Sequence, residues 1–194
     1  MMNTLYAYRP QSEARYIEGH AEFRMPFKAG MKVIELGGGD NPLYHPNADV
    51  RWLPQVDIVC DLNHPLPIAP GEYDGLYCSY ALEHLSWRHV HGFLSECHRI
   101  LRPGGIAVFI TANLWEQCRV LTHASDWDEK LICMLFGDQN YAANTHRCGF
   151  SPEYATKVLK DIGFYEIAIY PHPQAVTDMI VQAHKSQAEV HDGK

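Results

Sequence analysis

An acidic residue and three consecutive glycines, Glu35 and Gly37–Gly39, follow a short apolar run in "VIELGGGDNP". Glycine inside a regular element costs up to about 1 kcal/mol relative to alanine. Three in a row therefore indicate that the backbone needs a conformation or a close contact that side chains would prevent. That need is usually close approach to a ligand, although a purely structural turn stays possible. The order E-x-G-G-G differs from the G-x-G-x-x-G of dinucleotide sites, and the prolines that follow disfavour a long helix there.

Polar residues also follow two later apolar runs. Asp61 stands at the end of "VDIVCD", whereas Asp57, on the same side of that strand, lies inside it. Ser79 and Tyr80 come directly after "YDGLYC". Such residues meet at one edge if the runs are parallel strands, because ligands bind at the carboxyl ends of parallel strands.

The elements that would position these residues alternate along the chain. Strand-length apolar runs, "MKVIEL", "VDIVCDL", "YDGLYCS" and "GIAVFIT", favour buried parallel strands. Apolar residues at helical spacing predict a helix over 90–101, and a second helix follows Ser151 as its N-cap and ends at Gly163. "FYEIAIY" and "VTDMIVQAHK" have so short a connection that they should pair antiparallel.

This pattern predicts one α/β domain. We expect residues 31–194 to form it, residues 1–30 to be an N-terminal extension, and 112–150, with helical "LWEQCRVL" and "EKLICMLF", to be an insertion over the strand ends. A chain of 194 residues with 46% hydrophobic residues has enough material for one core.

Charge and cysteine content exclude several function classes. The net charge of −7, without a Lys/Arg-rich run, argues against a broad nucleic-acid surface. No apolar run is long enough to span a membrane, and no secretory leader is evident. The six cysteines are scattered without a C-x-x-C pair, so we expect reduced thiols and a cytoplasmic location.

The twelve histidines raise the question of a metal site. No H-E-x-x-H and no clustered Cys/His set is present, so the sequence predicts no metal. His84, after the "YDGLYCS" run, and His146, after the insertion, are set apart by their positions. Taken alone, each is more often a structural histidine than a catalytic one.

Taken in order, "VIELGGGDNP", "VDIVCDLNHPLPI", "EYDGLYCSYALEHL" and "HRILRPGGIAVFI" resemble the class I S-adenosylmethionine-dependent methyltransferases, in particular the small type 11 group. The resemblance covers residues 31–111 closely and 146–184 more loosely. It implies a Rossmann-like, seven-stranded mixed sheet flanked by helices, with the last strand inserted antiparallel.

The resemblance also implies cofactor contacts. Glu35 would orient the glycine loop or meet the amino group of S-adenosylmethionine, and Gly37, Gly38 and Gly39 would let the backbone approach the methionine and ribose portions. The ribose carboxylate falls on Asp49, only ten residues after Gly39, which requires a truncated first crossover; an exposed loop aspartate is the alternative.

Further along, the resemblance places Asp61 and Leu62 at the adenine, and Ser79 and Tyr80 beside the cofactor. It puts His84 next to the transferable methyl group and lets His146 enter the same pocket from the opposite side. A neutral imidazole there could accept a proton from the acceptor.

The expected function is methyl transfer to an unidentified acceptor, with a small molecule favoured. "SYAL" replaces the N/D-P-P-Y motif and no Pro-Cys pair is present, which disfavours adenine-amino and cytosine-C5 methylation of DNA. Two alternatives stay open. One is a non-catalytic module that binds S-adenosylmethionine. The other is a nicotinamide-dependent oxidoreductase, although this sequence lacks the glycine pattern of dinucleotide sites. The acceptor atom, the use of a general base and the oligomeric state cannot be predicted.

Overall fold

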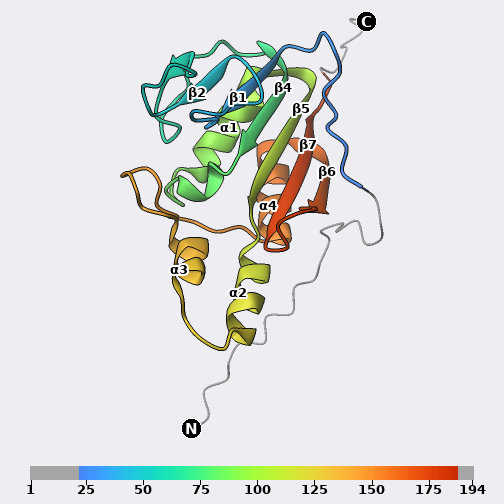
Figure 1. Cartoon of the computed structure of the whole chain (residues 1–194). Helices are drawn as coiled ribbons and strands as arrows, with labels where there is room; N and C mark the ends of the chain where they lie inside the picture. The colour runs from blue at the N-terminus through green and yellow to red at the C-terminus, as the bar shows by residue number, and fades with distance from the viewer. Residues whose placement is uncertain (1–21, 188–194) are drawn as a thin grey trace, which may run out of the picture.

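The computed structural model describes residues 22–187. They form a domain around one seven-stranded sheet with the strand order β3-β2-β1-β4-β5-β7-β6 (Figure 1). The strands are β1 (Val33–Leu36), β2 (Asn47–Asp49), β3 (Ile58–Val59), β4 (Tyr73–Ser79), β5 (Leu101–Ala112), β6 (Phe164–Pro171) and β7 (Asp178–Lys185). The helices are η1 (Leu82–His84), α1 (Val90–Ile100), α2 (Leu114–His123), α3 (Glu129–Phe136) and α4 (Pro152–Ile162).

The first five strands are parallel, and their early connections are short. No helix lies between β1 and β4, because the linking segments are rich in proline, asparagine and aspartate. This confirms the truncated first crossover. The strand expected over "VDIVCDL" is shorter than predicted and spans only Ile58–Val59.

The C-terminal strands complete the mixed sheet. β7 pairs antiparallel with both β5 and β6, and so lies between them. The prediction of a seven-stranded mixed sheet with an inserted antiparallel last strand is confirmed. The α4 helix between β5 and β6 begins and ends as its sequence indicates, since the Ser151 side chain accepts a hydrogen bond from the Tyr154 amide and Gly163 is left-handed.

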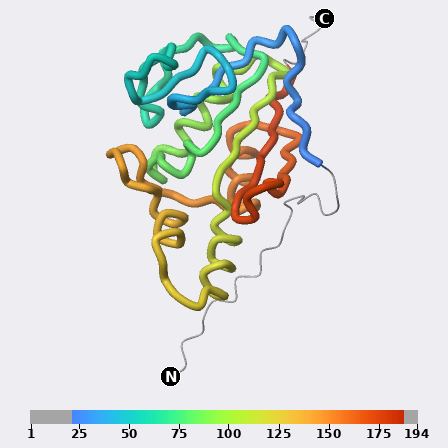
Figure 2. The backbone as a smooth tube through the Cα atoms, viewed as in Figure 1, coloured from blue at the N-terminus to red at the C-terminus, as the bar shows by residue number. Residues whose placement is uncertain are grey.

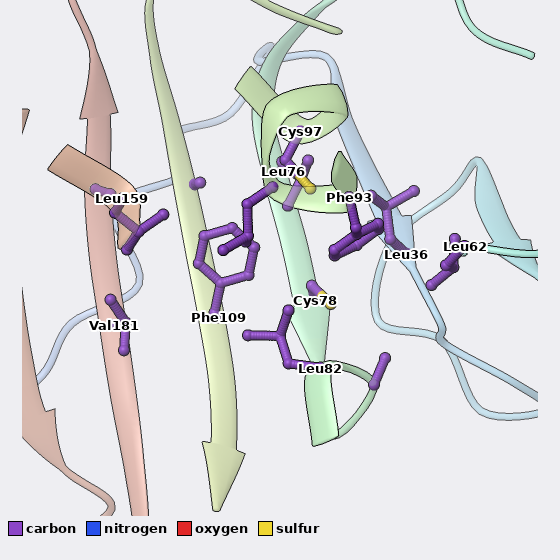
Figure 3. Packing of buried hydrophobic residues seen from close by; sticks show 14 of the residues in the cluster. Leu36, Leu62, Leu76, Cys78, Leu82, Phe93, Cys97, Phe109, Leu159 and Val181 are labelled. Carbon is purple, nitrogen blue, oxygen red and sulfur yellow. The ribbon is translucent and has the colours of Figure 1, made fainter. Parts of the chain in front are cut away.

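Helices α1 and α4 cover one face of the sheet. Figure 3 shows Leu76, Phe109 and Val181 of the strands packed against Phe93 and other residues of these helices. Burial of this apolar surface is the main source of the fold's stability, and it holds the strand ends in fixed register.

An extended segment contributes to the cover on the opposite face. Phe23, Met25 and Phe27 pack against a second cluster that contains Tyr77 and Val108. Figure 2 shows this segment in blue beside the red closing strands. It contains no helix, and the part of the predicted 1–30 extension that precedes residue 22 lies outside the described residues.

The 112–150 segment leaves the sheet at the carboxyl end of β5. Its helices α2 and α3 project from the body of the domain (Figure 1). Asn113 and Phe150 form a parallel bridge that closes the base of the segment. Within residues 22–187, no helix is both long and apolar enough to cross a bilayer.

Candidate active site

A cavity of about 260 Å³ lies at the carboxyl ends of the parallel strands. It is lined in part by six residues predicted for the site: Gly37, Asp49, Asp61, Leu62, Tyr80 and His84. Among the other predicted residues, Glu35, Gly38, Gly39, Ser79 and His146 do not contribute to its lining. The six predicted residues come from four separate segments, and the insertion adds a fifth segment to the lining.

The glycine loop is close-packed against its own neighbours. Gly37 has φ +80°, and a Cβ atom there would lie 2.5 Å from the Cβ atom of Ala81. A Cβ atom on Gly38 would lie 2.7 Å from both Asn47 Oδ1 and Glu35 Oε1. A Cβ atom on Gly39, which has φ +60°, would lie 2.2 Å from the Arg51 side chain, so the packing or the backbone disfavours a side chain at all three positions. Gly37 also forms part of the cavity wall.

The Glu35 side chain holds the loop that follows the three glycines. Its Oε2 atom accepts hydrogen bonds from the amides of Leu43 at 2.6 Å and Tyr44 at 2.8 Å. Burial raises the pKa of Glu35, and these two hydrogen bonds oppose that shift. The carboxylate therefore orients the loop through protein amides.

Asp49 ends β2 and is almost fully buried. One carboxylate oxygen accepts a hydrogen bond from the Gly39 amide at 3.0 Å, and the other accepts from the Arg51 amide at 2.8 Å and from its Nε at 3.2 Å. The Arg51 guanidinium stacks over the Tyr141 ring at 4.7 Å. Asp49 is therefore not the exposed loop aspartate of the alternative interpretation.

Asp61 follows β3 and keeps a solvent-facing carboxylate, with 44% of its side chain exposed. One oxygen accepts hydrogen bonds from the backbone and side-chain nitrogens of Asn63, at 2.9 and 2.8 Å. Burial works to raise the pKa of Asp61, but these hydrogen bonds, with His64 and Arg147 nearby, hold it below its usual value. Asp61 is thus an ionised acceptor on the cavity wall.

Tyr80 turns the chain sharply after β4. Its φ is +51°, a value that few residues other than glycine adopt, and its hydroxyl donates a 2.8 Å hydrogen bond to Asp178 on β7. Burial and this hydrogen bond raise its pKa. Ser79 is the last residue of β4 and does not line the cavity.

His84 and His146 are brought together although they lie 62 positions apart in the sequence. Their ring centroids are 4.9 Å apart in an edge-to-face arrangement. The Arg147 amide donates to the Glu83 carbonyl at 2.8 Å, which ties the two segments by their backbones. Burial lowers the pKa of both imidazoles, so both are mainly unprotonated at neutral pH.

Glu83 lies between the histidine pair and the sheet. Its side chain is buried, and its Oε2 accepts a hydrogen bond from Thr111 Oγ1 at 2.8 Å. Burial raises its pKa to about 7. Glu83 was not predicted from the sequence, although "EHL" places it beside His84 and no apolar periodicity explains it.

Nine residues of the cavity lining were not predicted, and three of them carry charged or phenolic groups. Arg51, Tyr141 and Arg147 border the cavity. Arg51 follows Asp49 by two residues, a spacing that can bring the two charges together. Tyr141 and Arg147 come from the insertion and reach the cavity only through the path of that segment.

Comparison with known proteins identifies a related family. A family model described as a methyltransferase domain matches residues 40–109. An uncharacterized methyltransferase from Synechocystis sp. is 31% identical over 42% of this chain and 47% of its own. The chain thus spans about half the length of the curated relative it matches.

Solved structures share the fold at low identity. A Burkholderia thailandensis 1,6-didemethyltoxoflavin N1-methyltransferase, bound to that compound and S-adenosylhomocysteine, has a TM-score of 0.55 at 16% identity and covers 81% of this chain and 72% of its own. A methyltransferase from Mesorhizobium loti has a TM-score of 0.56 at 16% identity, covering 80% and 91%. Phosphoethanolamine N-methyltransferase 2 of Haemonchus contortus, in complex with S-adenosylmethionine, has a TM-score of 0.58 at 12% identity, covering 84% and 50%.

The sequence match and the fold agree with the resemblance drawn from the motifs. The model match lies within the segment where that resemblance is closest, and the sheet has the seven strands and the antiparallel last strand that it implied. Residues 40–109 of this chain therefore match a methyltransferase domain, and the described residues have the fold of S-adenosylmethionine-dependent methyltransferases.

Proposed function

We propose that this chain transfers the methyl group of S-adenosylmethionine to a nucleophilic acceptor. The observation that carries the proposal is the shared cavity, on which Gly37, Asp49, Asp61 and Leu62 meet. These residues occupy the places that the family resemblance implies for the cofactor. A small-molecule acceptor and a cytoplasmic location remain predictions.

The residues on the cavity wall fit a nucleoside that carries a positive sulfur. Leu62 and Ala81 offer apolar surface for a base. Asp61 is an exposed acceptor for an exocyclic amino group, and Asp49, although engaged by Gly39 and Arg51, retains lone pairs for ribose hydroxyls. Asp49 and Asp61 are matched by Arg51 and Arg147 on the same lining, so the charged side chains of the cavity wall balance one another.

When bound, S-adenosylmethionine supplies an electrophilic methyl carbon on a good leaving group. The chain must then mainly align donor and acceptor, and such alignment is worth about 7–11 kcal/mol. A lone pair of the acceptor forms the new bond to the methyl carbon, and the pair of the broken carbon–sulfur bond stays on sulfur. Any proton on the acceptor leaves to a nearby base or to water.

We expect the acceptor to bind beside His84, which lines the cavity, while His146 contacts His84 from outside the lining. His84 lines the cavity, and the lowered pKa values of both imidazoles leave each with a lone pair at neutral pH. Such a lone pair can take a proton or bind a metal ion. We expect His84→Ala or His146→Ala to reduce turnover about 10²-fold or more while S-adenosylhomocysteine affinity stays nearly constant.

Calorimetric titration with S-adenosylmethionine, S-adenosylhomocysteine and NADH tests the cofactor. We expect the first two to bind and NADH not to bind; binding of NADH alone would favour the oxidoreductase alternative. Incubation with radiolabelled S-adenosylmethionine and fractionated cell extract then tests the activity. Tight binding without label in any fraction would favour a non-catalytic binding module.

A further inference from the structure

Three side chains of metal-ligating type converge at the acceptor side of the cavity. The candidate ligand atoms of Glu83, His84 and His146 all lie within 4.8 Å of one another. Glu83 and His84 belong to η1, and His146 lies in the segment that follows α3. The cluster is therefore a product of the tertiary structure.

Two features of this cluster favour a bound cation: an imidazole nitrogen without a hydrogen bond and a buried carboxylate without an ion pair. His84 Nδ1 is buried and has no hydrogen-bond partner among residues 22–187. Most buried polar atoms in folded proteins do have one. Glu83 is only 2% exposed, and within the same described range no cationic side chain forms an ion pair with it. Buried carboxylates are normally paired or bind metals.

The surroundings hold these ligands in place. Thr111 Oγ1, on β5, donates a 2.8 Å hydrogen bond to Glu83 Oε2 and so fixes the carboxylate. Hydrogen bonds of this kind to ligating groups are typical of metal sites. The His146 amide donates to the Phe136 carbonyl at 3.0 Å, and the Arg147 amide to the Glu83 carbonyl at 2.8 Å, so both segments are anchored by their backbones.

We propose that Glu83, His84 and His146 bind a divalent transition-metal ion, most suitably Zn²⁺. Two histidines and one carboxylate are a ligand set of catalytic zinc sites, in which a fourth position stays open. Bond lengths of about 2.0–2.2 Å place tetrahedral ligand atoms roughly 3.3 Å apart, so the side chains must close inward from their present separation. His84 borders the cavity, which gives the open position access to it.

This site deepens the proposed function, and its role rests on that function. A thiol or hydroxyl acceptor bound at the open position would lose its proton to solvent, because a bound cation favours the deprotonated form. The resulting lone pair on sulfur or oxygen would attack the methyl carbon, and the carbon–sulfur bond pair would stay on the donor sulfur. The acceptor class is then a thiol or a hydroxyl compound.

Titration of the chelator-treated full chain with Co²⁺, followed by visible absorption, tests the site without any need for activity. We expect saturation at about one ion per chain and displacement by Zn²⁺. His84→Ala and His146→Ala should each weaken binding more than tenfold, and Thr111→Val should weaken it about 10–100-fold by releasing Glu83. His64→Ala and His89→Ala are matched controls, because these two rings face each other outside the cluster at 6.5 Å.

The outcomes separate this proposal from the function on which it rests. Absence of Co²⁺ binding, or equal binding by the wild type and both cluster variants with circular dichroism unchanged, would overturn the metal site. If an alanine variant fails to fold, His84→Gln and His146→Gln provide the same comparison. Methyl transfer that persists in excess chelator would refute the metal's role alone, whereas Co²⁺ binding without S-adenosylmethionine binding would refute the proposed function alone.

Discussion

Replacement of Gly37 by alanine tests whether the cavity wall depends on the absence of a side chain. Gly37 has φ +80°, and the new Cβ atom would lie 2.5 Å from Ala81 Cβ. A left-handed backbone costs about 1–2 kcal/mol for a residue other than glycine, and overpacking adds about 1–3 kcal/mol. We therefore expect the free energy of unfolding to fall by about 2–5 kcal/mol.

Gly30 provides a matched control. Its φ is +87°, but an added Cβ atom would meet nothing within 4 Å. Gly30→Ala should therefore cost only the backbone strain of about 1–2 kcal/mol and leave S-adenosylhomocysteine affinity unchanged. The difference between the two variants isolates the contact with Ala81.

A double-mutant cycle completes the test. Gly37→Ala combined with Ala81→Gly removes the clash and should regain about 1–3 kcal/mol of stability relative to the sum of the single variants. Urea unfolding gives the free energies, and calorimetry gives the affinity for S-adenosylhomocysteine, which we expect only the Gly37 variants to lose. Equal losses of stability for Gly30→Ala and Gly37→Ala, or no coupling with Ala81, would refute the reasoning.

Other predictions concern charged side chains. Asp61→Asn should weaken discrimination for a ligand that carries an adenine amino group, and Asp49→Ala should weaken all ribose-bearing ligands, each by about 1.5–3 kcal/mol in calorimetric titration. Negligible effects at both positions would remove them from the cofactor site. Glu96 pairs with Arg99 at 2.7 Å, and this hydrogen bond, against a smaller effect of burial, lowers the pKa of Glu96 below 4.5. The pair stabilises the folded state at neutral pH and loses this effect as pH falls through the lowered pKa, so Glu96→Gln should cost about 1 kcal/mol at neutral pH and less in acid. Urea unfolding of the wild type and the Glu96→Gln variant at neutral and acidic pH measures this. An equal difference in the free energy of unfolding at the two pH values would contradict the linkage.

The order of elements was predictable because it depends on local patterns. Apolar runs of strand length, the cap at Ser151 and the glycine at 163 act within a few residues, and the structure confirms the cap, the glycine and the presence of a strand in each run. The short link between the last two runs fixed their antiparallel pairing. The length of β3 was not predictable, because a strand persists only while a neighbour pairs with it, and here β2 offers three residues.

The residues of the cavity were predictable in part. Gly37 and Asp61 were identified from the sequence by their places at strand ends, since parallel strands bring their carboxyl ends to one edge, whereas Asp49 was implied by the family resemblance. Which side chains turn inward was decided by packing: Glu35 is engaged by loop amides, and Ser79 does not line the cavity. Their contacts with a cofactor stay predictions.

The sequence by itself determined the mixed sheet, the helix boundaries and the strand-end positions from which a ligand is reached. Only the tertiary structure decided that a loop beyond α3 returns to η1, placing His146 beside His84 and both against buried Glu83. No metal site was predicted from the sequence, because known metal motifs have ligands at fixed spacings. A cluster made by backbone hydrogen bonds between distant segments has no such spacing, because the distance between its members is set by folding and not by the chain between them.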